Sequence, residues 1–338
     1  MTRGRDLYEF LQDRSTLAVV SHNNPDPDSL ASAMALGEVA DEAGVDEVDV
    51  FYSGEITHQQ NRAFVNLFDL DLTAFSVDAV SGADAVAFVD HSTHGRNNDV
   101  PDHVEVDIVI DHHTADEVSA PFVDHREELG ATATILTEYL TDLELPVDER
   151  LATALVFAIR RETLAFLRGT TRAEYEAVAT LDPNVDDELL RTLTNPAISE
   201  ATVDAIGDAI ENRKTYGSAL ISHTGRTTER DALPQAADYL SDLEGVQTTV
   251  VFGIIDDEVE LSGRSADSRV HIGDTLQDAF GDVGSAGGHR EMAGGTVPLG
   301  LFSDYSDDDD RLVEMVEQIV TRRLVEAMNL TERDTTEE

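Results

Sequence analysis

Short apolar runs, most of them followed at once by histidine or aspartate, recur along the first half of the chain. Thr16–Ser21, Val48–Tyr52, Ala85–Val89 and Val106–Ile110 have the length and composition of buried strands. A helical pattern over Asp28–Glu42 separates the first two. Strands that alternate with helices predict an α/β domain, with a parallel sheet covered by helices on both faces. Ligands of such sheets bind beyond the carboxyl ends of the strands.

The residues at three of these strand ends are of the kinds that bind metal ions. They are His22, Asp26 and Asp28 after the first strand, Asp90 and His91 after the third, and Asp111, His112 and His113 after the fourth. Carboxylate and imidazole ligands without thiolate suit Mn²⁺, with Mg²⁺, Co²⁺ or Zn²⁺ as alternatives. Two such ions ~3.5–4 Å apart can clamp a phosphoryl oxygen and generate hydroxide. Taken singly, Asp26 and Asp28 could equally be solvated loop residues or helix caps, and His22 a structural histidine.

The charge of the chain is extreme. The 338 residues include 69 acidic and 23 basic ones, for a net charge of −46, and Lys214 is the single lysine. So many surface carboxylates repel one another unless salt shortens the electrostatic screening length, which is ~3 Å at 1 M. We therefore expect adaptation to molar intracellular salt, as in halophilic archaea, rather than an acidic mesophilic protein. Binding of a polyanion through many lysines weakens as the salt concentration rises. A nucleotide would therefore be bound through metals, backbone N–H groups and a few arginines.

Composition also excludes several classes of protein. Cysteine is absent, so disulfides and thiol catalysis are excluded. No apolar run approaches the ~20 residues of a membrane span, and Met1–Asp13 lacks the apolar core of a signal peptide. We expect a cytoplasmic protein with no membrane partner.

The second half of the chain has a different pattern. Residues 131–213 are mostly helical, with breaks at Asp182-Pro183-Asn184 and Asn195-Pro196. The expected elements after them are a strand over Tyr216–His223, a helix over Ala232–Leu243, strands over Thr248–Ile255 and Val259–Ser262, a Gly-rich stretch over Gly281–Gly295, a final strand, and a helix over Asp310–Asn329. We expect a first domain over residues 1–195, a hinge or linker helix region over 196–215, and a smaller α+β domain over 216–330.

Several strings, taken together, resemble a known family. HNNPDPDSLAS, FVDH, IDHH and GATATILTEYL resemble the successive motifs of the DHH phosphoesterase superfamily. SGRS and GSAGGHREMAGG resemble its DHHA1 substrate-binding domain. The resemblance runs from about Leu17 to Leu299. Length and domain content are most similar to the nanoRNase/pAp phosphatase branch, since RecJ exonucleases usually carry additional domains.

The resemblance implies a role for each matching residue. His22 and Asp26 would hold one metal, Asp28 and His112 a second, and Asp90 would bridge the two. His113 would contact the substrate phosphate or act as an acid, and Asp111 would orient its histidine neighbour. The family closes the second site with an aspartate, where this chain has Glu162. The longer side chain still permits ligation but changes the reach, and Glu162 could instead be an exposed helix residue.

The Gly-rich stretch of the second half does not follow the dinucleotide-binding pattern, so a Rossmann function is rejected. Gly287 and Gly288 would let the backbone approach a phosphate, and His289 would contact the substrate. Arg264 offers a planar fork that matches phosphate, and Arg96 is a further candidate. The alternative for both is a surface arginine.

These observations predict an enzyme that trims short single-stranded oligonucleotides or dephosphorylates pAp-like nucleotides, with its cleft between the domains. A homodimer is possible. The alternatives are a RecJ-like exonuclease, a cyclic dinucleotide phosphodiesterase, a phosphatase acting on pyrophosphate or polyphosphate, and a nucleotide-binding regulator without catalysis. The low aromatic content of 6% and the absence of tryptophan argue against a long stacking channel.

Overall fold

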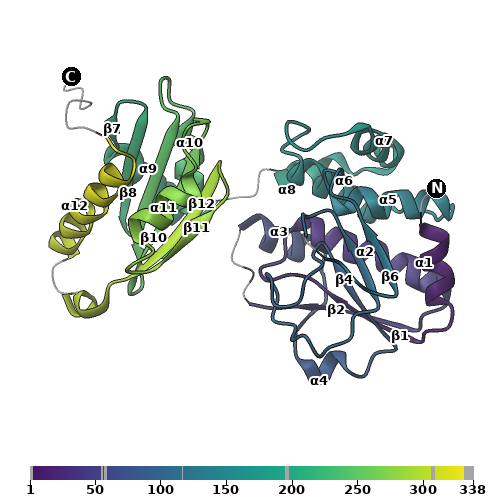
Figure 1. Ribbon diagram of the computed structural model, residues 1–338. Coiled ribbons are helices and arrows are strands. Elements are labelled where there is room, and N and C mark those ends of the chain that lie inside the picture. The colour runs from purple at the N-terminus through teal and green to yellow at the C-terminus, as the bar shows by residue number, and fades with distance from the viewer. Residues whose placement is uncertain are drawn as a thin grey trace. The chain divides into compact units, whose positions relative to one another are not determined.

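The structure is a computed structural model that describes residues 3–54, 56, 59–115, 117–194, 198–305 and 309–330 (Figure 1). The chain divides into two compact units, Met1–Pro196 and Ala197–Glu338. Each unit is built around its own six-stranded sheet. The break expected at Asn195-Pro196 lies outside the described residues.

The first unit contains a parallel sheet, as the α/β pattern predicted. Its strands are β1 (Thr16–Val20), β2 (Glu47–Tyr52), β3 (Leu72–Ala74), β4 (Ala85–Val89), β5 (Ile108–Asp111) and β6 (Phe122–His125). They lie in the order β3-β2-β1-β4-β5-β6, and every pair is parallel. From β1 the chain adds β2 and β3 on one side. It then crosses back and adds β4, β5 and β6 on the other side of β1. This reversal between β1 and β4 is the point where doubly wound sheets bind ligands. The edge strands β3 and β6 were not predicted, because runs of three and four residues give too little pattern.

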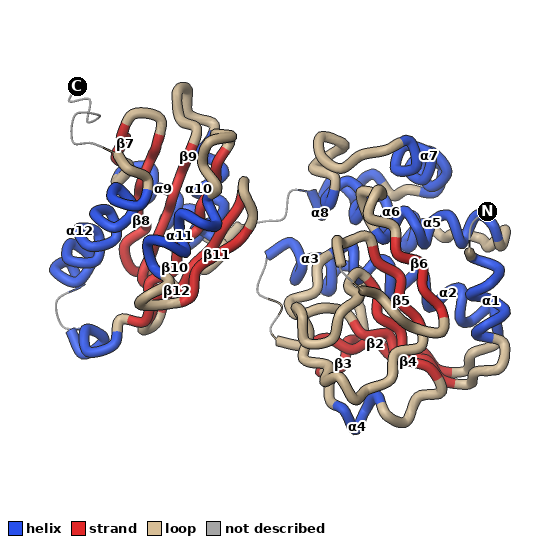
Figure 2. Tube along the Cα trace, viewed as in Figure 1, coloured by secondary structure: helices blue, strands red, loops and turns tan. Residues whose placement is uncertain are grey.

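The two faces of this sheet are covered differently. Leu17 and Val19 of β1 pack into one hydrophobic cluster, while Ala18 and Val20 pack into another, as the two-residue period of a strand requires. The helices of the unit are α1 (Gly4–Leu11), α2 (Pro27–Ala43), α3 (Gln59–Leu67), α4 (Val77–Val80), α5 (Thr132–Asp142), α6 (Glu149–Glu162), α7 (Arg172–Leu181) with η1 (Asp182–Asn184), and α8 (Asp187–Thr194). The first cluster contains α1, α2, α5 and α6, whereas short α4 and the irregular segment 91–107 cover the other face (Figure 2).

The second unit contains a mixed sheet with helices. Its strands are β7 (Lys214–Tyr216), β8 (Ala219–Arg226), β9 (Thr248–Ile255), β10 (Glu258–Ser265), β11 (Ser285–Gly288) and β12 (Met292–Pro298), in the order β11-β12-β10-β9-β8-β7. Among the described strands of this second sheet, only β8 and β9 pair in parallel. The helices are α9 (Glu200–Glu211), α10 (Ala232–Ser241), α11 (Ile272–Phe280), η2 (Gly300–Tyr305) and α12 (Asp309–Ala327).

Two expectations for the second unit were wrong in detail. The strand expected over Tyr216–His223 is a hairpin of β7 and β8, with Gly217 at a φ of 62° in the turn. The Gly-rich stretch Gly281–Gly295 contains β11 and the first part of β12, which form a hairpin, and helix α11 before it was not predicted. Within residues 196–215, helix α9 packs on β8, where the Ser222 hydroxyl donates to the Ala209 carbonyl. None of the helices in the described ranges combines the length and the hydropathy that a membrane span requires.

The net charge of −46 leads to a prediction about salt. Self-repulsion of the carboxylates falls as the screening length drops from ~10 Å at 0.1 M to ~3 Å at 1 M. We expect the thermal unfolding midpoint to rise by about 5 °C or more between low and molar KCl, which corresponds to roughly 2 kcal/mol for a chain of this size. A midpoint that stays level or falls over this range in scanning calorimetry would contradict the prediction.

Candidate metal centre

The polar residues predicted at three strand ends come together in the first unit. Strands β1, β4 and β5 are neighbours in the sheet, so their carboxyl ends lie side by side. Two groups of side chains lie close enough to hold a cation each, His22 with Asp26 and Asp90, and Asp90 with His112 and His113. Asp90 is the member that the two groups share.

Asp90 presents one carboxylate oxygen to each group. Its Oδ2 lies 3.5 Å from His22 Nε2, while its Oδ1 lies 3.7 Å from His112 Nε2. The residue is 2% exposed and has a φ of 67°, in the left-handed region that aspartate tolerates better than most residues. Its N–H donates to the Ile110 carbonyl, which fixes this conformation on the neighbouring strand. The carboxylate therefore has the orientation of a bridge between two sites.

His22 presents a free nitrogen to the first group. Its Nδ1 lies 2.9 Å from the Asn23 carbonyl, and since a carbonyl can only accept, Nδ1 carries the proton of the neutral ring. Nε2 then faces Asp26 Oδ1 at 3.8 Å and Asp90 at 3.5 Å. Burial opposes the charged ring, but the two carboxylates outweigh it and raise the pKa of His22 to about 11. The same field that attracts this proton would attract a metal cation.

Asp26 begins helix α2 and faces the centre at the same time. Its Oδ1 accepts from the N–H groups of Asp28 and Ser29 at 2.9 and 3.1 Å, as an N-cap does. Although burial opposes its charge, His22 and these two donors lower the pKa of Asp26 to about 2. The cap uses Oδ1, the same oxygen that faces His22, and leaves Oδ2 of Asp26 as a second ligand atom.

Asp28 is held by the start of another helix. Its Oδ2 and Oδ1 accept from the N–H groups of Thr132 and Ala133, each at 2.8 Å, at the N-terminus of α5. Burial raises the pKa of Asp28 well above its usual value, and Asp90, Glu162 and Asp26 raise it further. His112 Nε2 lies 3.7 Å from Asp28 Oδ2, so the structure brings Asp28 to the second group.

Within the Asp111-His112-His113 triplet, His112 faces the centre and His113 pairs with Asp111. His112 Nδ1 lies 3.1 Å from the Leu129 carbonyl, which leaves its Nε2 for the centre. His113 instead turns its Nδ1 to Asp111 Oδ1 at 2.9 Å, and its side chain is 53% exposed. The hydrogen bond to Asp111 is the main reason that the pKa of His113 rises to about 9, with Asp90 adding to it against the effect of burial.

Glu162 lies near the centre but is paired elsewhere. It is the last residue of α6, and its Oε1 accepts from Arg168 Nη2 at 3.2 Å. Burial raises the pKa of Glu162, and the charges of Asp26 and Asp90 raise it further. The structure thus places this carboxylate in the electrostatic field of the centre, with an arginine as its direct partner.

Arg96 lies on an exposed loop that is connected to the His22 loop. The Asn98 side chain accepts from the N–H groups of Gly95 and Val100 and donates to the carbonyls of Thr93 and Arg96 itself. The Asn23 N–H donates to the Asn97 carbonyl at 2.7 Å. The backbone that carries Arg96 is therefore fixed beside the loop after β1.

The remaining predicted residues lie in the second unit. Arg264 on β10 is paired with Asp238 and donates to the Ser262 hydroxyl. It lines a pocket of about 590 Å³ together with Tyr239 and Gln247. Tyr239 is 65% exposed, so its ring is available for contact with a ligand.

The glycines before His289 have a structural explanation. A Cβ on Gly288, which has a φ of 147°, would lie 2.6 Å from the Met292 carbonyl oxygen and from the Ala293 Cα. The close pairing of β11 with β12 therefore requires glycine there, whatever ligand approaches. Gly287 lies in the same strand, where a Cβ would meet only the Gln277 side chain, at 4.0 Å, and His289 is exposed at the turn that follows.

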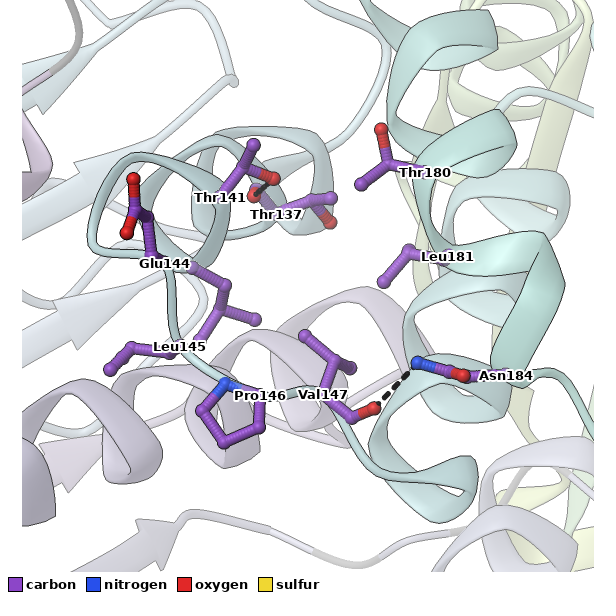
Figure 3. Close-up of a pocket in the computed structure, with 10 residues that line it drawn as sticks. Thr137, Thr141, Glu144, Leu145, Pro146, Val147, Thr180, Leu181 and Asn184 are labelled. Carbon is purple, nitrogen blue, oxygen red and sulfur yellow. Dashed lines mark hydrogen bonds between the residues drawn. The ribbon is translucent and has the colours of Figure 1, made fainter.

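A separate pocket of about 310 Å³ lies between α5 and α7 in the first unit (Figure 3). Thr137, Thr141 and Thr180 line it, and their hydroxyls donate to carbonyls of their own helices. The threonines therefore present methyl groups, and Glu144 is the one charged residue among the described residues of the lining. Such a lining does not suit a phosphate, and none of the predicted site residues belongs to it.

Two contacts at the centre were not predicted from the sequence. The Thr132 hydroxyl donates to Asp90 Oδ1 at 2.8 Å, and Arg168 pairs with Glu162. Thr132 belongs to the string GATATILTEYL, in which a polar residue directly before an apolar helix was a usable signal. No local signal marked Arg168.

The donor set fits a divalent metal. Asp90 Oδ2 and His112 Nε2 are buried and have no hydrogen-bond partner among the described residues. Such groups are costly to bury unless something pairs with them. A carboxylate shared by two imidazole-bearing groups, without thiolate, matches Mn²⁺ and similar ions.

Comparison with known proteins agrees with this geometry. The N-terminal domain of the DHH family matches residues 16–159, and the DHHA1 domain matches residues 216–322. An uncharacterized protein of Methanocaldococcus jannaschii is 37% identical over 325 residues, which cover 96% of this chain and 66% of that protein. A protein of Bacillus pumilus named probable manganese-dependent inorganic pyrophosphatase is 30% identical over 210 residues, which cover 58% of this chain and 68% of its own length. The chain thus spans just under two thirds of the first relative.

Solved structures share the fold. An exopolyphosphatase-related protein from Bacteroides fragilis has a TM-score of 0.71 at 15% identity, over 94% of this chain and 97% of that one. RecJ from Thermus thermophilus, in complex with Mn²⁺, has a TM-score of 0.50 at 16% identity, over 95% of this chain and 59% of that one. At these identities the likeness concerns the fold alone.

The fold and the donor set of the centre fit the class of the metal-dependent phosphoesterases. The two matched domains make the assignment narrower, because the chain belongs to the DHH phosphoesterase superfamily.

Proposed function

We propose that this protein uses two Mn²⁺ ions to hydrolyse phosphate esters of small nucleotides, either very short oligonucleotides or pAp-like nucleotides. The observation that carries the proposal is the orientation of Asp90, whose two oxygens face His22 on one side and His112 on the other. Mg²⁺ or Co²⁺ would fit the same donors.

The proposed ligands divide between two sites. His22, Asp26 and Asp90 would hold the first ion, and Asp28, Asp90, His112 and Glu162 the second. When bound, two such ions neutralise phosphoryl oxygens and supply hydroxide at neutral pH. Burial of the donors in a mainly apolar unit keeps them oriented, since Asp28 and Asp90 are each 2% exposed.

His113 would act on the substrate. Asp111 Oδ1 accepts from its Nδ1, which leaves Nε2 of the half-exposed ring for a phosphate oxygen. In the metal-free chain Asp111 raises the pKa of His113 to about 9, so this carboxylate favours the protonated ring that would donate to that oxygen or to the leaving group. Asp111 would be the residue that orients it.

The second unit would supply nucleotide binding. Its pocket of about 590 Å³ contains the Arg264 guanidinium and an exposed tyrosine ring, Tyr239, within one lining. A guanidinium suits a phosphate, and an aromatic ring suits a base. This pair of groups favours a nucleotide over a bare inorganic phosphate. His289, the Gly287 and Gly288 backbone, and Arg96 of the first unit remain proposed contributors.

Inorganic pyrophosphate hydrolysis is the second candidate. The Bacillus pumilus relative, with 30% identity over 210 residues, is named for that activity. Pyrophosphate requires the metal centre and cations but no base-binding surface, so the two candidates differ in what they require of the second unit.

One substrate panel tests the proposal. The full chain in molar KCl with Mn²⁺ would be offered pAp, a dinucleotide, a cyclic dinucleotide, pyrophosphate and a long single strand. We expect kcat/KM for pAp or the dinucleotide to exceed the others by about tenfold or more. Preference for pyrophosphate would establish the second candidate, preference for the cyclic dinucleotide a phosphodiesterase, and preference for the long strand an exonuclease. Binding without turnover of any of them would favour a regulator.

A substitution at Arg264 tests the role of the second unit. Loss of a charge-assisted hydrogen bond to phosphate costs about 1.5–3 kcal/mol, so Arg264→Gln should raise KM for the preferred nucleotide by roughly tenfold or more, with kcat little changed. Arg269→Gln is the matched control, because Arg269 pairs with Asp267 on the same unit and its side chain is 79% exposed. Equal KM values for wild type and Arg264→Gln would remove Arg264 from the substrate site.

A further inference from the structure

The first turn of helix α5 contacts two carboxylates of the metal centre at once. The Thr132 hydroxyl donates to Asp90 Oδ1 at 2.8 Å, and the Thr132 N–H donates to Asp28 Oδ2 at 2.8 Å. The Ala133 N–H donates to Asp28 Oδ1 at the same distance. Two adjacent residues thus fix a carboxylate from α2 and another from the end of β4.

The N–H donors are available because of their position in the helix. The first N–H groups of a helix have no partner within it, and they carry the positive end of its dipole. Asp28 uses both oxygens on them, which fixes the plane of its carboxylate. Each oxygen keeps a second lone pair, so this hold does not prevent ligation.

The hydroxyl contact acts on Asp90 in a different way. Rotation about the last bond of an aspartate side chain is broad and weakly restrained. Thr132 occupies Oδ1, while Oδ2 is buried without a partner among the described residues and faces His22. The hydroxyl therefore selects which oxygen is presented to each side of the centre.

The start of α5 is itself fixed in place. The Gly130 N–H donates to Glu174 Oε1 at 2.9 Å, and Glu174 is fully buried, with its other oxygen accepting from the Thr171 N–H. A Cβ on Gly130 would lie 2.6 Å from the Gly169 carbonyl oxygen and 2.8 Å from a Thr163 methyl group. This packing leaves the first turn of α5 little room to shift.

We propose that Thr132 is a positioning residue of the metal centre, whose hydroxyl sets the rotation of the Asp90 carboxylate before metal binds. The inference rests on the proposed two-metal function. It also assigns a role to the GATATILTEYL string, which supplies none of the proposed metal ligands. Thr132 acts through Asp90 and touches neither the reacting atoms nor the substrate.

The chain contains a matched control two residues away. Thr134 is also fully buried, but its hydroxyl has no hydrogen-bond partner among the described residues. Valine replaces threonine with nearly the same shape and without the hydroxyl. Thr132→Val and Thr134→Val therefore remove the same group from the same helix turn, and only the first loses a contact to the centre.

The experiment measures Mn²⁺ binding to the full metal-free chain by titration calorimetry and by the free-ion electron paramagnetic resonance signal, without any substrate. We expect Thr132→Val to weaken Mn²⁺ binding by about tenfold or more, as loss of a group that orients a ligand does. Thr132→Ser should restore binding, and Thr134→Val should bind as wild type does. If Thr132→Val does not fold, Thr132→Ala against Thr132→Ser makes the same comparison without added bulk.

Equal Mn²⁺ affinity in wild type and in the variants without the Thr132 hydroxyl would overturn the proposal. Equal weakening in Thr134→Val would also overturn it, because the effect would then come from packing. A wild-type chain that binds no Mn²⁺ would instead end the proposed function, whereas an unexpected substrate in the activity panel would leave this result untouched.

Discussion

Asp90→Asn should abolish turnover while leaving the protein folded. The substitution keeps an acceptor oxygen for Thr132 and a residue that tolerates the φ of 67°, but it removes the charge and one ligand oxygen that two metal sites would share. Loss of a group that merely orients a ligand costs ~10–100-fold in metal affinity. Loss of the bridge should therefore cost roughly 100-fold or more in Mn²⁺ affinity and at least as much in kcat/KM.

The same substitution should not lower the stability of the metal-free protein. Asp90 contributes to the raised pKa of Asp28 and of Glu162, which shows that these carboxylates repel one another. Removing one charge should leave the metal-free unfolding midpoint unchanged or higher. The gain from added Mn²⁺, about 2.7 kcal/mol at 100 times the dissociation constant, should disappear. Asp90→Ala should abolish turnover too, and it should also lower stability, because alanine adopts the left-handed region less readily than aspartate.

The control for this prediction lies at the other end of the same strand. Asp84 precedes β4 and accepts from the Ser15 N–H at 2.8 Å, away from the three ligand-bearing ends. Asp84→Asn should retain Mn²⁺ stabilisation and turnover. Wild-type Mn²⁺-dependent rates in folded Asp90→Asn would refute the bridging role and the two-metal function with it.

Glu162→Gln should weaken the second metal site by about tenfold or more, if Glu162 is a ligand of it. Glu162→Asp restores the residue that the family resemblance leads one to expect, so it should keep activity, with a changed preference between Mn²⁺ and Mg²⁺. The measurement is a Mn²⁺ titration of rate for the three proteins in the same molar salt.

The pairing of Glu162 with Arg168 allows a second test of this prediction. If Arg168 competes with a metal ion for the Glu162 carboxylate, Arg168→Gln should leave Mn²⁺ affinity equal to or higher than in wild type. If the pair only ties the end of α6 to the loop that follows, both substitutions should change stability by at most about 1 kcal/mol, as exposed pairs do. Superimposable Mn²⁺ curves for Glu162→Gln and wild type would remove Glu162 from the centre and strengthen the regulator alternative.

Most of the centre could be predicted because its residues follow buried strands. His22, Asp90 and His112 each come directly after an apolar run, and parallel strands end at one edge of a sheet. The position of Glu162 was expected from the family resemblance, but its pairing with Arg168 was not. That contact depends on the rotamers of two long side chains, for which the sequence has no periodic signal.

The second unit shows a different limit. The strand over Thr248–Ile255 was predicted with the bounds it has in the structure, because eight consecutive residues are buried in it. The β11–β12 hairpin was predicted only as a Gly-rich stretch before a final strand, since its glycines weaken any strand pattern. In the structure those glycines permit two backbones to approach within distances that a Cβ would block. Close backbone approach is a property of the pair of strands and not of either segment alone.

The sequence by itself determined the alternation of strands and helices, the residue types at the strand ends, and the absence of thiol ligands, because hydrophobic periodicity and residue chemistry act over a few neighbouring positions. Only the tertiary structure decided that β1, β4 and β5 are adjacent, that Asp90 divides its oxygens between two groups, and that Thr132 reaches Asp28 across 104 positions of the chain. Contacts at that separation depend on how the whole sheet and its helices pack together, and no local pattern encodes them.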